Sequence, residues 1–345
     1  MSRATFTIPD FIARCSFPLQ YHLHGDAIAQ DSDDWYRKAF NNFDRASLKK
    51  LSMLMAGKLS AYVYNDSDIF HLRASCDLMQ LIFHYGDLTD DLGAAENKTS
   101  ADLMMNALWF PELQYEKSTR SHPGSTEPAV SKLPRDFWLR CVRDASPAFE
   151  RRFLESFGLF LEARNIQCKH RSENVIPTLE EYIDIRRDSS GLKPLIDFLE
   201  YTLQIDIPEQ VMEHPIMHAM KQDVNDFCTW TNDIFSFNKE QACEDTYNMV
   251  IIFMKQHDME LQEAIDTVGE MCFKALESFE YYKTKLPSWG EDIDIQIARY
   301  IKGLENWLIA CLHWSYMSGR YFSTEGMNIK RTRIVNLLPL RKKAQ

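Results

Sequence analysis

Apolar residues recur along most of this chain with the three-to-four-residue spacing of amphipathic helices. A capping box formed by Thr178 and Glu181 opens one helix, which runs to about Arg186 and stops near Gly191. The alternating pattern of a strand is not sustained anywhere, so we predict an all-α fold. The spacing predicts four further long helices, over about 68–92, 215–241, 258–285 and 291–320.

One long stretch lacks this periodicity. Residues from about 114 to 133 are polar and include two prolines and one glycine, which is typical of a loop. Because helical patterns of the same kind lie on both sides, we interpret the stretch as a surface loop within one domain. The predicted domain therefore spans 1–345, with 325–345 as a C-terminal tail.

Composition narrows the possible functions. Hydrophobic residues make up 45% of the chain, enough for a large core, while 12 glycines and 13 prolines are too few for the many turns of an all-β fold. A formal charge of −11 argues against a nucleic-acid partner. If the substrate is an anion, local arginines, lysines or bound metal must offset this charge.

Targeting signals are not visible in the sequence. The N-terminus lacks the basic and apolar regions of a signal peptide, and no run of 18 apolar residues predicts a membrane span. The eight cysteines are scattered without a C-x-x-C pair, which indicates reduced, buried thiols. We therefore predict a cytoplasmic protein, either a monomer or a homodimer.

The segment TNDIFSFNKEQ carries the clearest chemistry. Asn232, Ser236 and Glu240 are spaced by four residues, so a helix places their oxygen atoms on one face. Such oxygen ligands suit Mg²⁺, and Lys239 adds a cation that could reach a phosphate. Three polar residues at this spacing are usually just a solvated face. Here aromatic residues cover much of the same helix, and burying unpaired polar groups costs about 1–3 kcal/mol each, which a ligand would offset.

This N-D-x-x-S-x-x-x-E pattern, with lysine just before the glutamate, resembles the second metal motif of microbial class I terpene synthases. The resemblance is closest to the mushroom-type (basidiomycete) sesquiterpene synthases. A looser pattern, in which Asn225 takes the place of Asn232, occurs seven residues earlier and ends at Asp233. We prefer the later register because it fits the family motif at every position.

Other features of the resemblance follow in order along the chain. Arg186 lies 46 residues before the motif and matches the family's diphosphate-sensing arginine. Ser189 and Ser190 follow at the predicted break, where the family places backbone groups that help to trigger ionisation. Arg320 and Tyr321 match the family's terminal Arg-Tyr pair. The aromatic approach to that pair is matched by Trp307 and Trp314.

The other metal motif, D-(D/E/N)-x-x-D, departs from the family. Alignment from the preceding LRASCDLMQ places the family's first aspartate at Gly86. Asp87, Asp90 and Asp91 remain on one helical face, where three carboxylates repel one another unless cations bridge them. The alternative is a solvated helix end, although acids there oppose the helix dipole. We expect Asp87 to be the direct ligand, with Asp90 next.

Two other readings of acidic residues are less favourable. Asp31-Ser-Asp-Asp34 matches the D-x-D-D acid of class II terpene cyclases, but those enzymes need further helical domains. Ser32 fits better as a helix cap ahead of Trp35. A chain-elongating prenyltransferase should carry two aspartate-rich motifs, and this sequence has one.

The resemblance implies a single bundle of antiparallel helices around a central cavity. About three Mg²⁺ ions would hold a prenyl diphosphate there, together with Arg186, Lys239, Arg320 and Tyr321. The substrate implied is farnesyl diphosphate, and the product a sesquiterpene hydrocarbon or alcohol. The residues whose aromatic faces could stabilise the carbocation, each of which could equally be plain core, are Phe83, Trp307 and Trp314.

Two alternatives stay open. A prenyltransferase would require isopentenyl diphosphate for turnover. A catalytically degenerate protein that only binds diphosphate or a partner is the second alternative, and Gly86 is the feature that motivates it.

Overall fold

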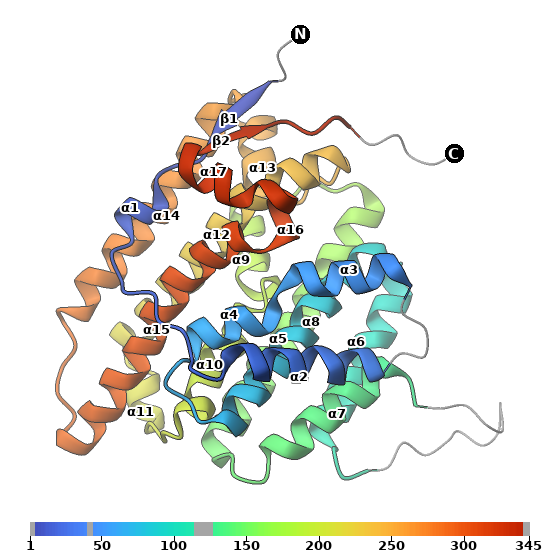
Figure 1. Cartoon of the computed structure of the whole chain (residues 1–345). Helices are drawn as coiled ribbons and strands as arrows, with labels where there is room; N and C mark the ends of the chain where they lie inside the picture. The colour runs from blue at the N-terminus through green and yellow to red at the C-terminus, as the bar shows by residue number, and fades with distance from the viewer. Residues whose placement is uncertain (1–3, 40–43, 114–126, 341–345) are drawn as a thin grey trace.

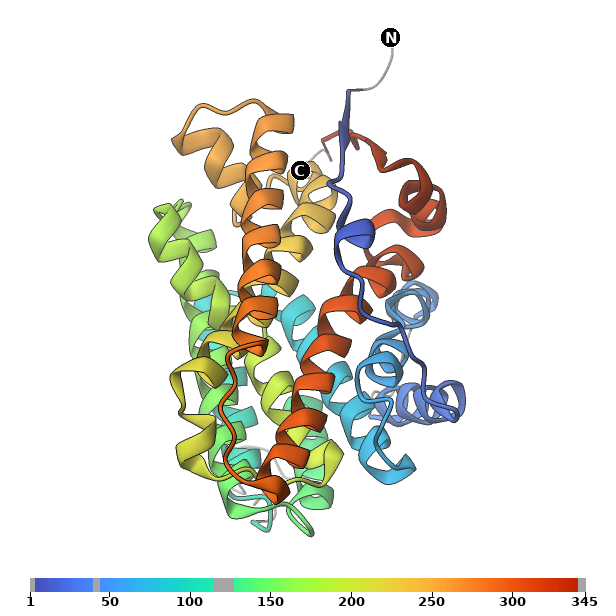
Figure 2. The same cartoon turned by 90° about the vertical axis from the view of Figure 1, so that its left-hand side faces the viewer.

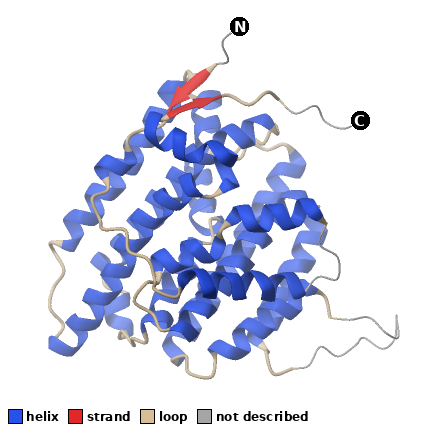
Figure 3. Ribbon diagram, viewed as in Figure 1, coloured by secondary structure: helices blue, strands red, loops and turns tan. Residues whose placement is uncertain are grey.

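The computed structural model describes residues 4–39, 44–113 and 127–340, and this part of the chain is mostly helical (Figure 3). The predicted all-α fold is confirmed. In the first half the elements are β1 (Thr5–Thr7), α1 (Phe11–Arg14), α2 (Gly25–Lys38), α3 (Arg45–Leu54), α4 (Ala56–Val63), α5 (Ile69–Asp91), α6 (Ala94–Trp109), α7 (Ala129–Cys141) and α8 (Pro147–Glu173). In the second half they are α9 (Leu179–Ser189), α10 (Leu192–Leu203), α11 (Glu209–Met212), α12 (Pro215–Ala242), α13 (Met249–Gln256), α14 (Leu261–Lys283), α15 (Glu291–Met317), α16 (Gly319–Phe322), the 3₁₀ turn η1 (Ser323–Glu325), α17 (Gly326–Thr332) and β2 (Ile334–Asn336).

The long helices form a bundle with α12 near its centre. Figure 2 shows α14 and α15 with opposite chain directions, joined by a loop at the bottom of the view. Helix α12 packs against α14, α15, α10, α9 and α13, while α5 packs against α2, α4, α10 and α8 (Figure 1). The helices predicted at 68–92 and 215–241 are α5 and α12, whose ends lie within one residue of the predicted bounds.

The helix predicted over 291–320 is divided. Helix α15 ends at Met317, Ser318 has an extended backbone, and the short α16 then carries Arg320 and Tyr321. The helix predicted from 258 begins three residues later, at Leu261.

Helix α10 is buried along almost its whole length. Every residue in it except Lys193 is buried. Its two buried acids are paired across the core: Lys221 Nζ lies 2.8 Å from Asp197, and Arg152 donates two hydrogen bonds to Glu200. The pairing offsets part of the large desolvation cost of the charges.

Local capping sets the helix ends near the future site. Asp68 accepts hydrogen bonds from the backbone N–H groups of the first turn of α5. The capping box of Thr178 and Glu181 opens α9 as predicted. Gly191 separates α9 from α10 with φ +74°, and a Cβ atom there would lie 2.6 Å from Ile82, so both backbone conformation and space require glycine.

The predicted loop over 114–133 is only partly correct. Residues 114–126 lie outside the described residues, but α7 already begins at Ala129. Pro134 lies inside this helix. Burial of Phe137 and Trp138 in the core offsets the hydrogen bond that proline removes.

The predicted C-terminal tail is structured as far as residue 340. It contains α17 and β2, and β2 pairs antiparallel with β1 so that Val335 lies opposite Phe6. Figure 1 shows β1 and β2 side by side at the top of the view. Three-residue strands are too short to show a periodicity, and the partner strand lies at the far end of the sequence.

The predicted cap at Ser32 is also wrong, because Ser32 lies buried inside α2. The eight cysteines are free thiols and six are buried, whereas Cys243 is exposed. Within the described ranges, we find no helix with both the length and the apolar character needed to cross a membrane.

Two helical glycines should respond oppositely to alanine. A Cβ atom at Gly57 would lie 2.5 Å from the Ala29 side chain and 2.6 Å from its backbone, so Gly57→Ala should lower the free energy of unfolding by about 1–3 kcal/mol. At Gly86 the nearest atom is 3.9 Å away, so Gly86→Ala should raise it by up to about 1 kcal/mol. Urea denaturation of both variants measures the difference. Equal effects would contradict the packing described.

Candidate active site

A cavity of about 1250 Å³ opens between the end of α5, the second half of α12 and α16. These elements are far apart in sequence, and α12 and α16 are in contact. Both polar and apolar side chains line the cavity, as is typical of small-molecule sites. The sequence-predicted residues among them are Asp87, Asp90, Asn232, Ser236, Lys239, Glu240, Arg320 and Tyr321.

The α12 motif presents its oxygen atoms on one face. Asn232 Oδ1 accepts a hydrogen bond from Arg186 at 2.9 Å, while its Nδ2 donates to the Tyr321 hydroxyl at 2.5 Å. Glu240 Oε2 accepts from Asn248 Nδ2 at 2.8 Å. Burial, together with the nearby charges of other acids, raises the pKa of Glu240 to about 7.

Ser236 lies between these two residues with its hydroxyl oxygen buried. Among the residues that the structure describes, no hydrogen-bond partner reaches this oxygen. A buried hydroxyl without a partner costs about 1–3 kcal/mol, which a bound ligand would offset.

The motif's second residue, Asp233, points away from the cavity. It accepts hydrogen bonds from the Tyr182 hydroxyl at 2.6 Å, from Arg186 Nη2 at 3.0 Å and from the backbone N–H of Met249 at 3.2 Å. Asp233 therefore positions Arg186 beside Asn232. In the sequence, Asp233 was a candidate ligand only in the rival register, although it is also the second residue of the preferred motif. Its position directly after Asn232 was the available signal that it could position a partner of that asparagine.

The side chains of the rival motif form hydrogen bonds with other residues of the fold. Arg187 forms two hydrogen bonds to Asp226, at 2.8 and 2.7 Å. Asn225 donates to the Arg187 carbonyl oxygen and accepts from the Ser190 hydroxyl at 3.2 Å. Neither Asn225 nor Asp226 lines the cavity, so the geometry favours the later register.

On the facing helix, Asp87 is paired with Arg320. Two Arg320 nitrogens lie 2.9 and 3.2 Å from its carboxylate oxygens. Burial would raise the pKa of Asp87, but the charges of Arg320 and Lys239 outweigh it and hold the pKa below its usual value. Position 86 has room for a side chain, since the nearest atom to a Cβ placed on Gly86 would be an Arg164 nitrogen at 3.9 Å.

Asp90 is held by two arginines of α8. Arg164 Nη2 lies 2.8 Å and Arg171 Nη1 lies 2.5 Å from its Oδ1 atom. Neither arginine was predicted from the sequence. Their spacing of seven residues on one face of a phenylalanine-rich helix was the available signal. The side chain of Asp91 lies outside the described part of the structure.

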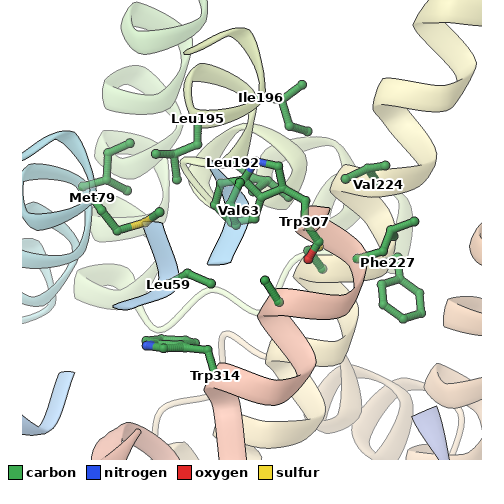
Figure 4. Close-up of a cluster of buried hydrophobic side chains, with 14 of the residues drawn as sticks. Leu59, Val63, Met79, Leu192, Leu195, Ile196, Val224, Phe227, Trp307 and Trp314 are labelled. Atoms are coloured by element: carbon green, nitrogen blue, oxygen red, sulfur yellow. The ribbon is translucent and has the colours of Figure 1, made fainter. Parts of the chain in front are cut away.

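The predicted aromatic residues lie behind the charged groups. The Arg320 guanidinium is 5.0 Å from the Phe83 ring centroid, and Phe83 lies 5.1 Å from Trp314. Trp314 donates its indole N–H to the Leu54 carbonyl oxygen at 3.0 Å. Figure 4 shows Trp307 and Trp314 on α15 within a cluster of buried hydrophobic side chains. None of these three predicted aromatic residues is part of the cavity wall.

The serines at the α9–α10 break are not brought to the cavity wall either. The Ser190 hydroxyl is engaged by Asn225, as described above. Ser189 is buried, and no described residue forms a hydrogen bond with its hydroxyl oxygen. Any contribution from this break would therefore come from its backbone or from a rearrangement.

The donor atoms suit a hard divalent cation. No group of three or more histidine, cysteine, aspartate or glutamate side chains gathers into a metal cluster within residues 4–39, 44–113 and 127–340. The α12 face instead offers an amide, a hydroxyl and a carboxylate oxygen, a mixed set that fits Mg²⁺ with water and phosphate as further ligands. The unpartnered Ser236 oxygen supports this fit.

Comparisons with known proteins agree with this geometry. Residues 77–278 match the family model "Terpene synthase family 2, C-terminal metal binding". The chain is 44% identical to sesquiterpene synthase Agr3 of Cyclocybe aegerita, over 97% of this chain and 94% of the relative. It is also 44% identical to alpha-muurolene synthase of Coprinopsis cinerea, over 98% and 79%. The crystal structure of α-eudesmol synthase superposes with a TM-score of 0.77 at 18% identity, covering 88% of this chain and 98% of that one, which supports the fold.

The raised pKa of Glu240 predicts proton release when Mg²⁺ binds. A ligating carboxylate must be ionised, so a group with a pKa of about 7 loses its proton to the solvent on binding below that pH. Calorimetry with Mg²⁺ and inorganic diphosphate, in buffers of different ionisation enthalpy, should show more proton release at about pH 6 than at about pH 8.5. Glu240→Gln should reduce this difference to the part that diphosphate itself contributes. Equal release in wild type and variant would exclude Glu240 as the source.

Proposed function

Because the chain belongs to terpene synthase family 2 and is a terpene synthase, we propose that it ionises farnesyl diphosphate in a Mg²⁺-dependent reaction and releases a sesquiterpene hydrocarbon or alcohol. The observation that carries the proposal is the cavity itself. It sets the oxygen face of Asn232, Ser236 and Glu240 opposite Asp87, with the cationic Arg320 beside that carboxylate. The fifteen-carbon substrate is proposed because the relative Agr3 is named a sesquiterpene synthase.

In the proposed site, metal ions are bound from two helices. The α12 ligands are Asn232, Ser236 and Glu240, and the α5 ligand is Asp87. Bound Mg²⁺, about three ions by the resemblance, would supply most of the positive charge that diphosphate needs as it leaves. Asp90 is less available than Asp87 as a metal ligand, because two arginines already donate hydrogen bonds to its carboxylate.

Four side chains are proposed to bind the diphosphate directly. Arg186, Lys239 and Arg320 contribute positive charge, and the Tyr321 hydroxyl donates a hydrogen bond. The Arg320 guanidinium also lies over the Phe83 ring. The group proposed to bind diphosphate is therefore in contact with an aromatic side chain as well.

Stabilisation of the carbocation by the aromatic faces of Phe83, Trp307 and Trp314 stays a prediction of the sequence, because none of the three lines the described cavity. The backbone at Ser189 and Ser190 is proposed to respond to the Arg186–diphosphate contact, since α9 carries Arg186 directly into this break. A cytoplasmic location and a monomer or homodimer remain predictions of the sequence.

Incubation with geranyl, farnesyl and geranylgeranyl diphosphates tests the function. We expect Mg²⁺-dependent release of diphosphate and a fifteen-carbon product from farnesyl diphosphate alone, detected by gas chromatography with mass spectrometry. Glu240→Gln should lower turnover steeply while the protein stays folded, because it removes a proposed ligand charge. Turnover that requires isopentenyl diphosphate would indicate a prenyltransferase. Diphosphate binding without turnover would indicate a degenerate member.

The substitution at Gly86 gives a second test of the same site. With Asp87 as the acidic ligand, Asp87→Ala should abolish turnover, because no carboxylate precedes it. Gly86→Asp fits sterically, and a sharp rise in its turnover would mean that glycine disables the site. Since this change also removes a helical glycine, up to about 1 kcal/mol of added stability must be measured separately by denaturation. Full activity of Asp87→Ala, with no gain from Gly86→Asp, would show that α5 holds no essential metal.

A further inference from the structure

Two arginines of α8 lie between the two proposed metal motifs. Arg164 and Arg171 are two turns apart and project from the same face. The Arg164 side chain is buried and donates to the Gly86 carbonyl oxygen at 2.6 Å, to the Thr89 hydroxyl and to Asp90. Arg164 therefore holds the last turn of α5 against α8.

Arg171 extends this connection to the chain that follows α12. Its Nη1 atom donates to Asp90 at 2.5 Å, and its Nη2 atom donates to Asp245 Oδ2 at 2.8 Å. Asp245 in turn accepts from the backbone N–H of Tyr247 at 3.0 Å. The Arg171 guanidinium also lies 6.0 Å from the Tyr247 ring centroid. One guanidinium thus joins two acids that are 155 residues apart, between Asp90 and Asp245.

The segment that contains Asp245 also holds Glu240. The Asp245 backbone N–H donates to the Glu240 carbonyl oxygen at 3.0 Å. Three residues later, Asn248 Nδ2 donates both to Glu240 Oε2 and to the Asp233 carbonyl oxygen, each at 2.8 Å. The orientation of the Glu240 carboxylate therefore depends on a segment that Arg171 ties to α5.

The charges around Asp90 argue against a metal on that carboxylate. Both guanidinium groups donate to its Oδ1 atom, so a divalent cation bound there would lie close to two positive charges. Asp87, by contrast, has one arginine partner, Arg320. The two acids of α5 therefore lie in different electrostatic surroundings.

We propose that Asp90 is not a metal ligand but the α5 end of a brace, Asp90–Arg171–Asp245, which positions the α12 metal motif relative to Asp87. The inference rests on the proposed function, because the brace serves a site that binds metal and diphosphate. Arg171 and Asp245 are positioning residues in this scheme, and Arg164 holds Asp90 in place for them.

The brace needs a guanidinium rather than only a positive charge. Arginine can donate to two carboxylates at once in a fixed planar geometry, whereas lysine offers a single ammonium group. Arg171→Lys should therefore lose the connection although it keeps the charge. This distinguishes a bridge from a general electrostatic effect.

The test is binding of Mg²⁺ with inorganic diphosphate to the full-length protein, measured by calorimetry, alongside the thermal unfolding midpoint of each variant. Arg171→Gln and Asp245→Asn should each weaken binding by about 10–100-fold, as is usual when a group that orients a ligand is removed. The double variant should bind no more weakly than the worse single variant, because both changes break one connection. Arg151→Gln is the matched control on α8, since Arg151 pairs with Glu209 outside the cavity, and it should bind like wild type.

Each competing explanation predicts a different pattern of Mg²⁺–diphosphate affinities among the variants. If Asp90 is a metal ligand, Arg171→Gln frees its carboxylate, and binding is unchanged or tighter. If Arg171 instead contacts diphosphate directly, Asp245→Asn releases the arginine, and only Arg171→Gln weakens binding. A lower unfolding midpoint with unchanged affinity would leave only a structural role. Each of these results overturns the brace.

Failure of the brace and failure of the proposed function are separable. Wild-type turnover of farnesyl diphosphate with additive effects in the double variant would overturn the brace alone. Coupled effects on Mg²⁺–diphosphate binding without turnover would overturn the proposed reaction alone. A wild-type protein that binds no Mg²⁺ and diphosphate would overturn both.

Discussion

The buried charge of Asp233 is the constraint on which the arrangement of the site depends. An ionised carboxylate inside a helical core costs several kcal/mol unless donors surround it. Tyr182, Arg186 and the backbone of Met249 supply those donors. Because Arg186 must face Asp233, it also comes to lie beside Asn232. A requirement of the core thus fixes a cation beside Asn232, a residue of the cavity wall, before any ligand binds.

Other acids in and around the site are likewise paired with cationic side chains. Asp87 is paired with Arg320, Asp90 with two arginines of α8, and Asp226 with Arg187. The chain carries a net charge of −11, but the cavity is not simply acidic. Asp87, Asp90 and Asp245 are each paired with arginine there, so that a diphosphate and its metal ions meet both signs of charge within a short distance.

The fold was largely predictable because helical periodicity is a local property. The capping box at Thr178, the break at Gly191 and the lengths of α5 and α12 all depend on residues within a few turns of one another. The failures have the opposite origin. The predicted loop is wrong over 129–133 because α7 packs against α5 and α6, and β2 exists because the N-terminal strand lies beside it.

For the site, the sequence by itself determined the face formed by Asn232, Ser236 and Glu240, because a spacing of four residues fixes it within one helix. It also supplied the resemblance that led to Arg186, Arg320 and Tyr321. Only the tertiary structure decided that Asp233 anchors Arg186 and that Arg171 links Asp90 to Asp245. These contacts join residues 47 to 81 positions apart, and no local pattern encodes which arginine meets which acid. That choice depends on how the helices pack, since burial makes an unpaired charge too costly to leave without a partner.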